Sequence, residues 1–129
     1  MNAGGSKELI VQIGLGQDAD PREVDEAVLR LRRTLLRLDV DEVKRPSGGP
    51  APDGARAVDG PLLGALLLTA SGGTIAAAVH AAEAWLRRGS ERTVRLQIGD
   101  DAIELTDVAT DTQRELLDVF LARHTPPPP

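Results

Sequence analysis

The sequence has no cysteine and almost no aromatic residues, and each shortage excludes a class of chemistry. Without cysteine there is no disulfide, no thiolate metal ligand and no cysteine nucleophile. Trp85 and Phe120 are the only aromatic residues, so the bases of single-stranded DNA or RNA have no platform on which to stack. A hydrophobic core must therefore be built from Leu, Val, Ile and Ala.

Positive charge is also in short supply. The formal net charge is −5, whereas proteins that bind a phosphate backbone present a basic surface. We therefore expect no nucleic-acid partner. Arg, Ala, Leu, Gly and Pro are abundant and Lys is scarce, a composition typical of high-GC bacteria such as actinobacteria.

Length and composition predict one folded domain over residues 1–129, since 129 residues with 41% hydrophobic content can bury one core. Flexible tails are expected at 1–7, which is Gly-rich, and at 125–129, which is Pro-rich. Residues 46–59 hold three prolines and three glycines without periodicity, which predicts a mobile loop. The N-terminus has no apolar signal segment, so we expect a cytoplasmic protein.

The first half of the chain predicts a strand, a helix and a second strand. Leu9–Leu15 is rich in β-branched residues and reads as a buried strand. Asp20, Pro21 and Glu23 form a helix start with a capping box, and the helix runs to about Arg37. Residues 38–45 then predict a strand parallel to the first, because a helix separates them.

The run from Gly60 to Ala82 contains no charged residue and predicts the centre of the core. Its apolar residues recur at intervals of three and four, which indicates helix, bent or broken near Gly72-Gly73. The predicted buried side holds Leu62, Leu63, Leu66, Leu67, Ala70, Thr74, Ala77, Ala78, Ala81 and Trp85. An alternative is a membrane span over 62–86, which has about the required length but contains Ser71, Thr74, His80 and Glu83.

The last third predicts a β-hairpin and a helix. Residues 94–98 and 103–106 alternate between apolar and polar, with Gly99-Asp100-Asp101 as the turn between them. Thr110 and Gln113 match a second capping box, which opens a helix that ends at His124.

These elements give an α+β fold in the order β-α-β-α-β-β-α. We expect a small four-stranded mixed sheet with helices on one face. The other face would carry Arg95, Gln97, Glu104 and Thr106.

No chemical motif in the sequence is complete. Gly14-Leu-Gly16 follows a strand as in dinucleotide folds, but the third glycine is missing and Asp18 and Asp20 stand where phosphate would bind. His80 and Glu83 can pair on a helix without a further metal ligand at the right spacing. Ser71 lacks a nucleophile elbow. We therefore expect no catalytic residue, metal or cofactor, and keep a small hydrolase or nucleotide-binding domain as an alternative.

Arginines gather in the second half of the first predicted helix. Arg30, Arg32, Arg33 and Arg37 read either as a solvated face or as a site for an anion or an acidic partner. Because Asp39, Asp41 and Glu42 lie close in sequence and can neutralise them, the solvated face is favoured. The partner hypothesis assigns Arg30, Arg33 and Arg37 to charge steering.

Four blocks, in this order, resemble the small effector-associated constant component family of bacterial conflict systems. The blocks are Gly64-Ala-Leu-Leu-Leu; Ala70-Ser-Gly-Gly; Ala84-Trp-Leu-Arg-Arg with Thr93-Val-Arg-Leu-Gln-Ile-Gly-Asp-Asp-Ala-Ile-Glu-Leu-Thr; and Gln113-Arg-Glu-Leu-Leu-Asp-Val-Phe-Leu-Ala-Arg-His. The likeness covers residues 62–124.

The resemblance implies a short intracellular protein encoded beside effectors such as caspase-like or trypsin-like peptidases. Its implied role is a non-enzymatic adaptor or regulatory subunit that couples a sensor to an effector in bacterial defence. The family carries no catalytic residues that would transfer to this sequence. The expected partner is therefore a protein effector or sensor, and a homo-oligomer is compatible with the sequence.

Overall fold

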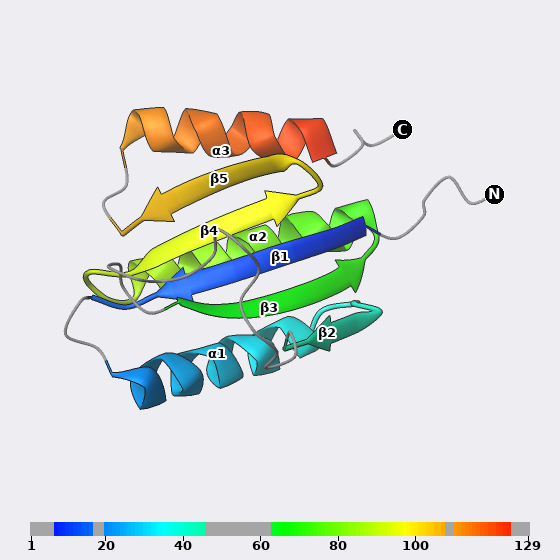
Figure 1. Cartoon of the computed structure of the whole chain (residues 1–129). Helices are drawn as coiled ribbons and strands as arrows, with labels where there is room; N and C mark the ends of the chain where they lie inside the picture. The colour runs from blue at the N-terminus through cyan, green and yellow to red at the C-terminus, as the bar shows by residue number, and fades with distance from the viewer. Residues whose placement is uncertain (1–6, 17–19, 46–62, 108–109, 125–129) are drawn as a thin grey trace.

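The structure is a computed structural model that describes residues 7–16, 20–45, 63–107 and 110–124. The described residues form five strands and three helices (Figure 1). In chain order these are β1 (Lys7–Gly14), α1 (Pro21–Leu36), β2 (Glu42–Lys44), β3 (Leu63–Ala70), α2 (Gly72–Arg87), β4 (Thr93–Ile98), β5 (Asp101–Thr106) and α3 (Asp111–His124).

The five strands form one sheet in the order β2-β3-β1-β4-β5, and every neighbouring pair is antiparallel. β1 lies at the centre, and Val11 is opposite Leu66 on β3 and Leu96 on β4. These three side chains therefore point to the same face of the sheet.

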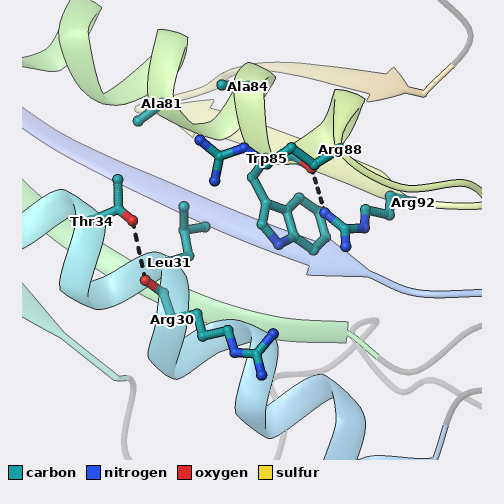
Figure 2. A pocket seen from close by; sticks show the side chains of 8 residues that line it. All are labelled: Arg30, Leu31, Thr34, Ala81, Ala84, Trp85, Arg88 and Arg92. Carbon is teal, nitrogen blue, oxygen red and sulfur yellow. Dashed lines mark hydrogen bonds between the residues drawn. The ribbon is translucent and has the colours of Figure 1, made fainter.

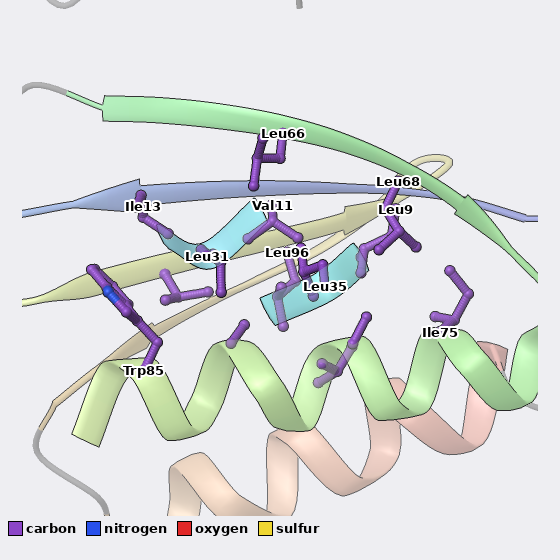
Figure 3. Packing of buried hydrophobic residues seen from close by; sticks show 14 of the residues in the cluster. Leu9, Val11, Ile13, Leu31, Leu35, Leu66, Leu68, Ile75, Trp85 and Leu96 are labelled. Atoms are coloured by element: carbon purple, nitrogen blue, oxygen red, sulfur yellow. The ribbon is translucent and has the colours of Figure 1, made fainter. Parts of the chain in front are cut away.

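The helices lie on that face and enclose the core (Figures 1 and 3). Figure 3 shows Ile75 and Trp85 of α2 and Leu31 and Leu35 of α1 on the same side of the sheet as Val11. All five are at least 92% buried. As the composition predicted, the core is aliphatic except for Trp85 and Phe120.

The opposite face carries no described helix (Figure 1). Arg95, Gln97, Glu104 and Thr106 alternate with core residues and lie on this open face, so that prediction is confirmed.

The third helix packs against β5 and is fixed near both of its ends. Two of its own side chains, Leu117 and Phe120, are buried in the core. Near its start, the side-chain amide of Gln113 accepts a hydrogen bond from the Thr106 backbone N–H and donates one to the Thr106 carbonyl, both at 3.1 Å. At its end, the Nε2 atom of His124 lies 2.7 Å from a carboxylate oxygen of Asp101.

The prediction of helix across the central apolar run is wrong before Ser71. Residues 63–70 form strand β3, and a helix starts only at Gly72. In this strand Leu66 and Leu68 are buried in the core, whereas Leu67 points to the open face. A strand that is apolar on both faces shows no alternation, so its residues also fit helical spacing.

The prediction of a four-stranded mixed sheet is also wrong: the sheet has five strands and is antiparallel throughout. The element order is β-α-β-β-α-β-β-α. β2 points the same way as β1, but β3 lies between them and pairs antiparallel with both. The helix between β1 and β2 correctly predicted that the two strands run in the same direction. It could not predict that residues 63–70 form a strand between them.

Other predicted elements are confirmed with small shifts of their bounds. The first strand, the hairpin and the flanking helices α1 and α3 are present. Both halves of the capping box at Asp20 form, whereas at the last helix only the Thr110 hydroxyl accepts its bond from the Gln113 N–H. Gly99 turns the hairpin with a φ of +60°, a conformation that favours glycine.

Several expectations concern residues beyond those described. The tails at 1–6 and 125–129 and the loop at 46–59 lie outside the described residues. Lys7, assigned to the first tail, instead begins β1. None of the described helices has the length and apolarity needed to cross a bilayer, and the proposed span over 62–86 falls on a strand and a separate helix.

Candidate functional site

A recess of about 190 Å³ lies between α1 and the C-terminal part of α2. We call it the arginine pocket (Figure 2). Its lining residues are Arg30, Leu31, Thr34, Ala81, Ala84, Trp85, Arg88 and Arg92.

The sequence places these side chains through the packing of the two helices. Leu31 on α1 and Trp85 on α2 are both buried core residues, and they bring the helices together. Arg30 and Thr34 flank Leu31 on α1, so they reach the same recess. The small residues Ala81 and Ala84 complete the lining on α2.

Arg92 is held against Trp85 by two contacts. Its guanidinium carbon lies 4.5 Å from the centre of the indole ring, within range of a cation–π interaction. Its Nη1 atom donates a hydrogen bond of 2.6 Å to the carbonyl oxygen of Trp85 (Figure 2). The Trp85 carbonyl also accepts a hydrogen bond from the Arg88 N–H, so Arg92 adds a second bond at the end of α2 and is held in position there.

The arginines of the pocket have no carboxylate partner within the described residues. The arginine–carboxylate ion pairs of the described residues lie elsewhere. They join Arg45 to Asp25, Arg87 to Glu83 and Arg123 to Asp101. Arg30, Arg88 and Arg92 form none.

The pKa of Arg92 reflects its burial and the positive charges near it. Partial burial lowers the pKa of its guanidinium, and the neighbouring charges of Arg88 and Arg30 lower the pKa further. Three arginines thus line one recess with Trp85, and Arg92 lies over its indole, in a chain whose net charge is negative.

This arrangement suits the binding of an anionic group. Guanidinium groups donate paired hydrogen bonds to carboxylate or phosphate, and partial burial strengthens such bonds. The lining contains no His, Asp, Glu or Lys that would exchange a proton near neutral pH. The Thr34 hydroxyl donates to the Arg30 carbonyl, so it is already engaged in the helix.

A second recess of about 360 Å³ adjoins the first and shares Arg92 with it. Its lining includes Gly16, Glu23 and Glu91. Glu91 has a φ of +59°, which an L-residue seldom adopts. A side chain at position 16 would lie against the Glu91 side chain, and the Glu91 carboxylate would have to move.

The structure brings only one of the predicted steering arginines into the pocket. Arg30 lines it, whereas Arg33 and Arg37 are exposed and lie outside it. Sequence reasoning did not find Arg88, Arg92 or the role of Trp85. The available signal was the segment 85–92, Trp-Leu-Arg-Arg-Gly-Ser-Glu-Arg, with its three arginines and one acidic residue.

Ser71 and His80, the residues considered for a hydrolase, have separate partners in the structure. The Ser71 hydroxyl lies 3.4 Å from the Thr74 hydroxyl, and His80 lies on the exposed side of α2 beside Glu83, at 3.8 Å. Glu83 in turn accepts a 2.8 Å hydrogen bond from Arg87. Within the described part of the chain, no group of three or more metal-ligating side chains comes together.

The helix that follows the partial dinucleotide motif is α1, and side chains of its own first turn cap its N-terminus. The Asp20 carboxylate accepts a 2.9 Å hydrogen bond from the Glu23 N–H at the start of α1. The Glu23 carboxylate accepts one from the Asp20 N–H at 3.0 Å. This end of α1 is therefore capped by its own residues and carries two negative charges where a phosphate would bind.

Comparisons of the chain with protein-family models, with curated proteins and with solved structures gave no match.

Proposed function

We propose that this chain is a non-enzymatic adaptor or regulatory subunit of a bacterial defence system. In this proposal it is a cytoplasmic protein that couples a sensor to an effector, such as a caspase-like or trypsin-like peptidase. The resemblance of residues 62–124 to the effector-associated constant component family supports the role. The arginine pocket supports a binding function.

The observation that carries the proposal is that three arginines line one recess with Trp85 and form no ion pair among the described residues. Arginine stays protonated throughout the physiological pH range, so it is suited to hold an anion and poorly suited to transfer protons. A protein partner with an acidic surface would supply the missing countercharges. Arg and Trp are also the residue types most enriched at the energetic centres of protein interfaces.

The test uses the purified chain and the proteins encoded by the adjacent genes. Each neighbour is titrated with the chain in a calorimeter, and any peptidase among them is assayed with and without the chain. We expect saturable binding to at least one neighbour and a change in its peptidase activity. Absence of binding to every neighbour would contradict the adaptor role.

A control addresses the alternative of a small hydrolase. The chain alone is incubated with peptide, ester and nucleotide substrates, and product is measured over time. Turnover that is lost in a folded His80→Ala variant would replace the adaptor proposal with an enzymatic one. His80 is suited to this control because its side chain is exposed, so the substitution leaves the core unchanged.

A further inference from the structure

We infer that the arginine pocket receives the carboxylate of an acidic segment in a partner protein. The inference rests on the proposed adaptor function and names the chemistry of the partner. Its basis is that Arg30, Arg88 and Arg92 line the same recess as the apolar residues Leu31, Ala81 and Ala84.

The charges in the pocket favour an anion because they form no ion pair with a carboxylate among the described residues. Arg30 and Arg88 are exposed at the rim, while Arg92 is half-buried against Trp85. A carboxylate placed among them would relieve the repulsion of like charges and accept charge-assisted hydrogen bonds. The methylene groups of a Glu or Asp side chain would pack on the neighbouring Leu and Ala residues.

The size of the pocket limits its ligand to one small head group. Its volume of about 190 Å³ is below the roughly 300–1,000 Å³ of sites that enclose cofactors and drug-sized molecules. A nucleotide would have to extend past Arg92 into the second recess, whose lining carries the acidic residues Glu23 and Glu91. One acidic side chain fits this volume while the rest of a partner segment stays outside, between α1 and α2.

The position of the pocket on the helices favours carboxylate over phosphate. Phosphate sites commonly use backbone N–H groups at a helix N-terminus, where the helix dipole is positive. The arginine pocket lies at the opposite end of α2, and Arg88 is its C-terminal cap residue. The negative end of the dipole disfavours a doubly charged phosphate more than a singly charged carboxylate.

Trp85 provides a direct measurement of occupancy. It is the only tryptophan in the chain, which has no tyrosine, so tryptophan fluorescence reports on this pocket alone. The chain is titrated at low salt with a hexaglutamate peptide, with hexalysine and with inorganic phosphate, and binding of each is also measured by calorimetry. We expect saturable binding of hexaglutamate only, weakened at high salt.

Matched arginine variants locate the binding. Arg30→Gln and Arg88→Gln should each weaken hexaglutamate binding about tenfold or more, because each removes a charge-assisted contact. Arg33→Gln and Arg37→Gln remove equal charge from exposed positions outside the pocket and should change the affinity less than twofold. Thermal unfolding of each variant checks that it remains folded.

Three results would overturn the inference. Equal losses in all four variants would mean diffuse electrostatic attraction in place of a site. Phosphate binding at least as tight as hexaglutamate, and lost in Arg88→Gln, would make the pocket a small-anion site. No saturable binding of hexaglutamate by calorimetry would leave the pocket without the proposed ligand.

The two proposals fail separately. If Arg88→Gln binds the neighbour-encoded partner as tightly as the wild-type chain, the adaptor role stands and the pocket is not its contact. If hexaglutamate binds in the pocket but no neighbour-encoded protein binds the chain, the pocket chemistry stands and the adaptor role is contradicted.

Discussion

The arginine pocket and the corner between α3 and β5 differ in whether their basic side chains contact a carboxylate. At the corner, one carboxylate of Asp101 contacts both Arg123, at 3.2 Å, and His124, at 2.7 Å. In the pocket, Arg30, Arg88 and Arg92 converge without a carboxylate among the described residues. In the first arrangement the basic side chains contact a carboxylate of the same chain, and in the second no such contact forms among the described residues.

The comparison separates polar groups that support the fold from groups that are available for binding. Corner residues should therefore change stability when they are removed. Pocket residues should change binding and leave stability almost unchanged. Four substitutions test this division.

The largest effect is expected when the apolar anchor of the corner is removed. Phe120 is 1% exposed, and Phe120→Ala should lower the free energy of unfolding by about 3–5 kcal/mol, because it leaves a cavity under α3. The measurement is urea denaturation followed by circular dichroism. The neighbouring Val119→Ala serves as the control, because Val119 is 52% exposed and should cost far less. Similar losses in both would mean that α3 is not anchored through Phe120.

A smaller loss is expected for the amide that completes the edge of β5. Gln113→Ala removes both hydrogen bonds to the Thr106 backbone and should cost about 1 kcal/mol, since water replaces part of each bond. Amide hydrogen exchange provides a local readout, and the Thr106 N–H should exchange faster in the variant. Thr112→Ala, at an exposed neighbouring position, is the control. Unchanged exchange at Thr106 would contradict a role for Gln113 at this edge.

Removing the shared carboxylate of the corner should have an effect of similar or smaller size. Asp101→Asn leaves Arg123 without its ion-pair partner and changes the contact with His124, and it should cost up to about 1 kcal/mol, because these groups are partly exposed to solvent. Glu104→Gln on the same strand is the matched control, since its carboxylate forms no ion pair within the described residues. If high salt left the difference between the two variants unchanged, the effect of Asp101 would not be electrostatic.

The smallest effect on the free energy of unfolding is expected in the pocket, where a substitution should stabilise the protein slightly or leave its stability unchanged. Arg30→Gln removes repulsion with Arg92 and should leave stability unchanged or raise it by about 0.5 kcal/mol at most. Arg123→Gln at the corner should lower stability by a few tenths of a kcal/mol, as loss of an exposed ion pair does. Calorimetric melting of the two variants side by side gives the comparison. A destabilised Arg30→Gln protein would show that Arg30 supports the fold.

The elements that could be predicted from the sequence are those with local signals. The capping residues Asp20 and Glu23 marked the start of α1, and alternation around Gly99 marked the hairpin. Strand β3 lacked such a signal because Leu67 on the open face is as apolar as Leu66 and Leu68 in the core. Its identity depends on pairing with β1, a contact between distant parts of the chain.

The candidate site was predictable only in part, for the same reason. Arg30 stood out because arginines cluster on α1, but the cluster itself does not form the site: Arg33 and Arg37 lie outside the pocket. Arg88 and Arg92 reach it from the end of α2 and the residues that follow. Their meeting with Arg30 depends on the packing of Leu31 near Trp85, which local sequence does not determine.

The central place of β1 has a consequence for the order in which the protein folds. It is synthesised before both of its partners, β3 and β4, which come from residues 63–98. Closing such long loops slows folding relative to local pairing. β1 must therefore stay unpaired during synthesis until β3 emerges, and α1 has no sheet on which to bury Val28 and Leu35 before then. Over that interval the exposed apolar strand is a target for chaperones and for aggregation.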